Sequence, residues 1–109
     1  MKQLFDQTKP RYMTSDIKEN LPIELTQYLW NCIEEAKKET VLDYLQVFKL
    51  DKIYDPVSKR MKQLIVHSQE EPMYTKEYVI EMIGDEGIKD TLFVIDDLDH
   101  QTILFARNY

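Results

Sequence analysis

The sequence predicts an α+β fold, in which one amphipathic helix packs on a mostly antiparallel, curved sheet of four to six strands. Residues 23–39 contain no helix breaker, and apolar residues recur there at spacings of three and four. After Thr40, several short segments are instead rich in β-branched and aromatic residues. The connections between these segments are short, whereas parallel strands need long crossovers, so we expect antiparallel pairing.

Two elements are expected before the sheet. Residues 11–14 (RYMT) suit a short strand, because Tyr12 and Thr14 favour a pleated surface. Asn20 is expected to cap the long helix, and Pro22 to lie in its first turn. The main apolar residues of this helix share one face: Leu21, Leu25, Leu29, Cys32 and Ala36.

The remaining chain predicts strands joined by turns. Residues 77–83 (EYVIEMI) also fit one face of a helix, but their β-branched content favours a strand. Residues 98–100 are expected to connect a hairpin. The other predicted strands are residues 43–50, 63–69, 91–97 and 101–108.

Length and composition are those of one globular domain. The chain has 109 residues, of which 43% are hydrophobic, so we expect a single domain over residues 1–109, with residues 1–10 as an irregular lead-in. No apolar run reaches 18 residues, and the first residues lack the apolar stretch of a secretory signal. Cys32 is the only cysteine, which excludes an internal disulfide. These features predict a soluble cytoplasmic protein with no membrane association.

The charge balance disfavours nucleic-acid binding. The formal net charge is −6 at pH 7, and an acidic surface repels phosphate backbones. The densest basic stretch comprises Lys59, Arg60 and Lys62. We expect it to be a solvated loop, with phosphate binding as the less favoured alternative.

The predicted strands are apolar on both faces over part of their length. Tyr44, Phe48 and Leu50 alternate with Leu45 and Val47. One helix can cover only one face of a sheet. The other face must therefore be buried by sheet curvature, by the N-terminal segment or by another chain.

Trp30 raises the same question on the helix. At about 100° per residue it lies well away from the apolar stripe and beside Ile23. Large aromatic side chains often anchor interfaces. Either the N-terminal segment or a later loop covers Trp30, or Trp30 and Ile23 bind a partner, which includes a second copy of the chain.

Residues 66–72 (VHSQEEP) contain several residue types that can act in an active site. His67 and Ser68 are neighbours on a predicted strand, so they point to opposite faces and do not form a nucleophile–base pair. His67 and Gln69 share a face, and the simplest interpretation is a strand that ends before Pro72. Binding through His67 and Gln69 is an alternative.

Residues 96–100 (DDLDH) contain three carboxylates and a histidine. These are metal-ligand types, but the spacing lacks the glycine and the distant glutamate of a calcium loop. Aspartate is also a common turn residue. We therefore predict no metal and no cofactor. An enzyme or metal-dependent site remains the alternative, built from His67, Gln69, Glu70 and the Asp96–His100 turn.

The segments RYMTSDI, LW, DYLQVFKL, LIVHSQEEP, FVIDD and TILFARNY occur in this order from Arg11 to Tyr109. This pattern resembles domain-of-unknown-function family 960, small proteins of staphylococci, related Gram-positive bacteria and their phages. The terminal FARNY departs from the more acidic end of the family pattern. The resemblance implies a cytoplasmic protein of bacterial or phage source, and it supplies no activity and no catalytic residues.

No complete catalytic constellation is present in the sequence. The function we predict is therefore a small non-enzymatic module for protein–protein interaction. Its partner would bind Trp30 and Ile23 or the uncovered face of the sheet. A second copy of the chain, in a homodimer, could bury either surface.

Overall fold

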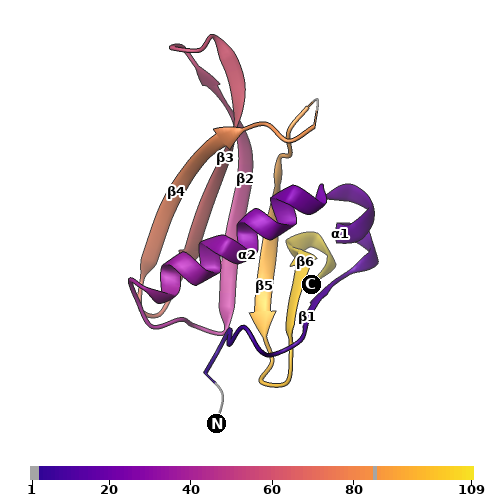
Figure 1. The fold of residues 1–109 in the computed structure, drawn as a ribbon, viewed down its shortest axis with the longest axis vertical. Coiled ribbons are helices and arrows are strands. Elements are labelled where there is room, and N and C mark those ends of the chain that lie inside the picture. The colour runs from indigo at the N-terminus through magenta and orange to yellow at the C-terminus, as the bar shows by residue number, and fades with distance from the viewer. Residues whose placement is uncertain (1–2, 85) are drawn as a thin grey trace.

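A computed structural model describes residues 3–84 and 86–109. Figure 1 shows a single sheet with a long helix, α2, lying diagonally across one of its faces. Residues 3–10 form turns without a helix or strand. The elements that follow are β1 (Arg11–Met13), α1 (Ser15–Asn20), α2 (Ile23–Lys37), β2 (Leu45–Asp55), β3 (Arg60–Gln69), β4 (Tyr74–Glu81), β5 (Asp90–Asp96), β6 (Gln101–Phe105) and a 3-10 turn, η1 (Ala106–Asn108). The α+β prediction is confirmed.

The six strands form one sheet in the order β1-β6-β5-β2-β3-β4. Strands β2, β3 and β4 are joined by consecutive antiparallel hairpins, and β5 then returns to pair with the other edge of β2. β5 and β6 form a further antiparallel hairpin. The short strand β1 pairs with β6 in parallel, so the sheet is antiparallel except at one edge.

The start of the long helix differs from the prediction. Asn20 does not cap α2, because it is the last residue of a separate short helix, and its side chain bonds back to Asp16. Pro22 is the N-cap residue of α2, which begins at Ile23. A proline cannot donate the backbone hydrogen bond that would continue α1, so the chain turns here and starts a second helix.

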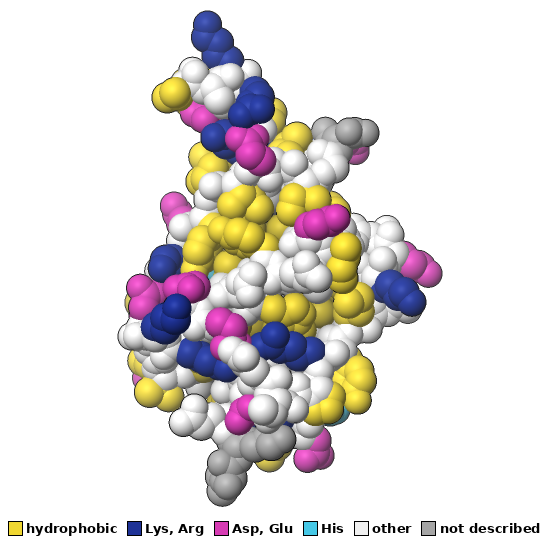
Figure 2. Space-filling model, in the orientation of Figure 1, with side chains coloured by type: hydrophobic (Ala, Val, Ile, Leu, Met, Phe, Trp, Pro, Cys, Tyr) yellow, Lys and Arg dark blue, Asp and Glu magenta, His cyan; other side chains and the backbone are white. Residues whose placement is uncertain are grey.

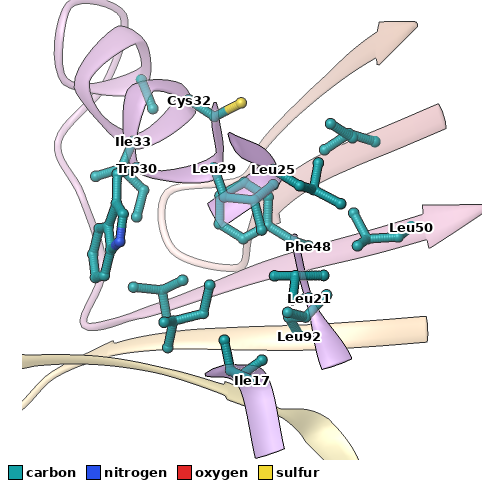
Figure 3. Close-up of a cluster of buried hydrophobic side chains, with 14 of the residues drawn as sticks. Ile17, Leu21, Leu25, Leu29, Trp30, Cys32, Ile33, Phe48, Leu50 and Leu92 are labelled. Atoms are coloured by element: carbon teal, nitrogen blue, oxygen red, sulfur yellow. The ribbon is translucent and has the colours of Figure 1, made fainter. Parts of the chain in front are cut away.

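The hydrophobic core lies between the two helices and one face of the sheet. Alternate residues of β2, β3, β5 and β6 are buried, as expected for strands covered on one side. Figure 3 shows side chains from α2, such as Leu25 and Leu29, gathered against Phe48 and Leu92 of the strands. Ile17 of α1 belongs to the same core.

The other face of the sheet carries a second apolar cluster. Its members are only half-buried, while both helices contribute their apolar side chains to the opposite face. The ring of the C-terminal Tyr109 packs edge-on against one member, Phe93, with 5.5 Å between ring centroids. We call these residues the open-face cluster: Leu45, Val47, Phe93, Ile95 and Leu104.

Candidate functional site

His67 is fully buried under the helix and not in an accessible pocket. Its ring stacks on Phe48, with 4.3 Å between centroids, and meets the edge of Tyr74. Nε2 of His67 lies 2.7 Å from Oε1 of Gln46. The Gln46 side-chain nitrogen donates to two oxygens, so its Oε1 accepts and His67 Nε2 must carry the proton.

Gln69 is the second polar residue of this buried row. Its Oε1 accepts from Gln46 Nε2 at 2.8 Å and from the backbone N–H of Asp43 at 2.9 Å. Its Nε2 donates to the backbone oxygens of Val41 and Pro72. The side-chain oxygen and nitrogen of Gln69 thus make all their hydrogen bonds within the protein. The side chain ties the α2–β2 connection to the β3–β4 turn, which is a structural role.

Burial lowers the pKa of His67 from 6.5 to about 4. Its Nδ1 has no hydrogen-bond partner among the described residues, so no carboxylate there stabilises the protonated ring. A neutral, fully enclosed imidazole cannot reach a substrate. Ser68 lies on the opposite face of β3, as the strand alternation predicts.

The Asp96–His100 segment is a hairpin turn held by bonds within the turn and by bonds to the N-terminal residues 5 and 9. Asp96 is buried and pairs with Lys9 at 2.6 Å, and it also accepts from the backbone N–H groups of Phe5 and Leu98. Burial alone would raise the pKa of Asp96, but the hydrogen bonds from Lys9 and these N–H groups hold it below its ordinary value. Asp97 pairs with His100 at 3.0 Å.

The alternative site made of these residues is not assembled in the fold. Strand β2 lies between β3, which carries His67, and β5, which ends at Asp96. Within residues 3–84 and 86–109, no group of three His, Cys, Asp or Glu side chains is arranged to hold a metal ion.

Trp30 and Ile23 do not form a shared surface. Trp30 is 9% exposed and belongs to the core, whereas Ile23 is 51% exposed. The guanidinium of Arg11 lies 4.6 Å from the centre of the Trp30 ring, and Glu34 holds Arg11 in place at 2.7 Å. Arg11, the first residue of β1, therefore lies over the Trp30 ring.

The open-face cluster is a row of half-buried apolar side chains on the sheet face opposite the helices α1 and α2. Strand register sets Val47 beside Phe93, Phe93 beside Leu104, and Leu45 beside Ile95, so the side chains form adjoining rows. A shallow pocket of about 270 Å³ adjoins the cluster, lined by Asp43, Tyr44, Leu45, Val47, Lys49, Ser68, Gln69 and Glu70. The alternating pattern of the strands indicated such a face, but the pairing partners determine which residues share it.

None of the described helices is long and apolar enough to span a membrane.

Comparison with known proteins places the chain in a family without assigning an activity. A crystal structure of a protein of unknown function from Enterococcus faecalis matches with a TM-score of 0.83 and 23% sequence identity, over 100% of this chain and 98% of that chain. At this identity the likeness shows the fold alone. No curated protein matches the sequence. The family model for staphylococcal proteins of unknown function, DUF960, matches residues 10–108, so the chain belongs to that family.

Proposed function

We propose that the protein is a small, non-enzymatic, cytoplasmic module whose open sheet face packs against a second copy of the chain. The supporting observation is the open-face cluster, in which apolar side chains lie side by side on the face opposite α1 and α2. A sheet with two apolar faces is stable when both are buried, and contiguous apolar patches mark interaction surfaces.

The distribution of charge favours a second copy as the occupant. All members of the cluster are uncharged, and the neighbouring charged residues Asp43, Lys49 and Glu70 lie along the adjoining pocket. In a two-fold interface the same patch meets itself, so a charged centre would bring like charges together. An uncharged centre avoids that cost, and two such faces would pack about 10 Å apart.

Substitution of Val47 by lysine is expected to weaken self-association by roughly 100-fold or more, because an unpaired charge would be buried at the interface. Val47 belongs to the cluster and lies directly beside Phe93, with Ser68 on its other side. Sedimentation equilibrium of wild-type and variant protein measures the change. Ile23→Lys and Val41→Lys are matched controls at exposed positions away from the sheet face.

The controls should associate as the wild type does. A wild-type protein that stays monomeric at high concentration would refute the second copy as the occupant. Association that is unchanged in Val47→Lys but lost in Ile23→Lys would move the interface to helix α2.

A further inference from the structure

The β2–β3 hairpin extends beyond the rest of the sheet. β5 pairs with β2 only as far as Leu50, and β4 pairs with β3 only from Lys62 onward. The pairing of β2 with β3 continues to Asp55 and Arg60. Residues 51–62 form an arm at the end of the sheet, and its outer part, residues 53–61, has two strands only. The arm projects from the end of the molecule in Figure 1.

The arm carries large apolar side chains that the fold does not bury. Val57 at the tip is 91% exposed, and Tyr54 is 55% exposed. Met61, directly opposite Tyr54 in the register, and Ile53 are also exposed. Figure 2 shows hydrophobic and basic side chains together on this projection. Exposed apolar residues on a narrow arm contribute little to the core, so stability does not account for them.

The arm also has the opposite charge to the protein. Residues 51–62 contain four Lys or Arg and two Asp or Glu, whereas the whole chain contains 14 and 20. Arg60 and Lys62 pair with Glu81, and Lys62 also pairs with Asp55. Lys52 and Lys59 are exposed and have no ion-pair partner among the described residues. The arm is therefore a positive projection on an acidic body.

The tip of the arm is held in a defined shape. The carboxylate of Asp55 accepts from the backbone N–H of Val57 at 3.0 Å and from the Ser58 hydroxyl at 2.8 Å, and it pairs with Lys62. The backbone N–H of Lys59 donates to the Asp55 carbonyl oxygen at 2.7 Å. A loop ordered before binding loses less entropy on binding, which favours its use in recognition.

We propose that this arm is a second binding element, which recognises an acidic polypeptide segment carrying apolar side chains. Lys52 and Lys59 would attract the carboxylates, and Tyr54, Met61 and Val57 would contact the apolar side chains. This inference is independent of the open sheet face, because the two surfaces share no residue.

Charge decides between a protein partner and a nucleic acid. A two-stranded ribbon can enter the major groove of DNA. The remainder of this chain is strongly acidic, however, and would repel the flanking phosphates. A short acidic polypeptide can meet the arm without approaching the rest of the protein.

The test uses a short fluorescein-labelled peptide in which glutamate alternates with leucine and tyrosine. It is titrated with the full-length protein by fluorescence anisotropy, and the site is mapped by amide chemical shifts. We expect shifts confined to residues 51–62 and affinity that falls at high salt. The double variant Lys52→Glu/Lys59→Glu should weaken binding about tenfold or more. Tyr54→Ser/Val57→Ser should weaken it by a similar factor.

Two matched variants and two further ligands make the outcome decisive. Lys18→Glu/Lys89→Glu reverses exposed lysines elsewhere and should change the affinity less than about twofold. Val47→Lys should bind as the wild type does. Equal binding of an all-glutamate peptide would overturn the role of the apolar side chains, and tighter binding of duplex DNA would overturn the choice of partner. Shifts outside the arm, or self-association lost in the arm variants, would overturn the proposed site.

Discussion

Replacement of Asp96 by asparagine is expected to lower the free energy of unfolding by about 3–5 kcal/mol. The Lys9 and Asp96 side chains are almost fully buried and 2.6 Å apart. Without the carboxylate charge, the Lys9 ammonium would stay enclosed with no counter-charge. Asp96 also anchors the N-terminal segment to the β5–β6 turn, since it accepts from the backbone N–H of Phe5. Urea unfolding, followed by fluorescence of the single buried tryptophan, measures the loss.

A double-mutant cycle separates the pair from its surroundings. Lys9→Met alone should also destabilise the protein. The double variant Lys9→Met/Asp96→Asn should cost less than the sum of the single variants, because it leaves no unpaired buried charge, whereas each single variant leaves one. Asp97→Asn is the matched control in the same turn. Asp97 is exposed, so its loss should change stability by no more than about 0.5–1 kcal/mol. The assigned role of the pair would be contradicted if the losses in free energy of unfolding of the two single variants added up to that of the double variant. It would also be contradicted if Asp96→Asn were as stable as Asp97→Asn.

Lowering the pH from about 7.5 to about 4.5 is expected to remove about 2–3 kcal/mol of stability through His67 alone. Its pKa is about 4 in the fold and 6.5 without the fold. As the pH falls below about 6.5, the unfolded chain binds a proton that the folded protein excludes. The loss therefore begins near pH 6.5 and is complete near pH 4.

A variant that cannot titrate at position 67 tests the source of this pH effect. His67→Gln keeps a donor for Gln46 but cannot titrate, so its stability should vary much less with pH in this range. It should be less stable at pH 7.5, because the stacking on Phe48 is lost. Urea unfolding at a series of pH values checks both expectations, and a wild-type slope in His67→Gln would contradict the buried neutral state.

Local patterns predict most of the elements but not all of their limits. The strand segments were found because apolar and polar residues alternate in them, and residues 77–83, predicted as a strand, overlap β4. β2 continues to Asp55, past the predicted end at residue 50. The sequence does not indicate this extension, because its residues, such as Lys52, are exposed and show no alternation of buried and exposed positions. The sequence does not predict helix α1, because α1 has only six residues and buries one apolar side chain, Ile17.

The sites depend on contacts between distant residues, which a single sequence does not reveal. Lys9 meets Asp96 across 87 residues, and Gln46 meets His67 across 21. Trp30 belongs to the core and Arg11 lies over its ring, whereas its place away from the apolar stripe left open whether the chain or a partner covers it. The alternation of residues in the strands predicts that a second apolar face exists. Which residues form that face depends on the pairing of β5 with β2, and only the folded structure shows this pairing.

The most direct test of the proposed function is the solvent accessibility of the open sheet face as a function of protein concentration. Methyl signals of Leu45, Val47 and Ile95 can be followed by NMR in the presence of a soluble paramagnetic agent. We expect these methyl groups to become protected as the protein associates, while the methyl groups of Ile23 and Val57 stay accessible. Equal accessibility of the open-face methyl groups at every concentration, with or without a rise in molecular mass, would contradict the account.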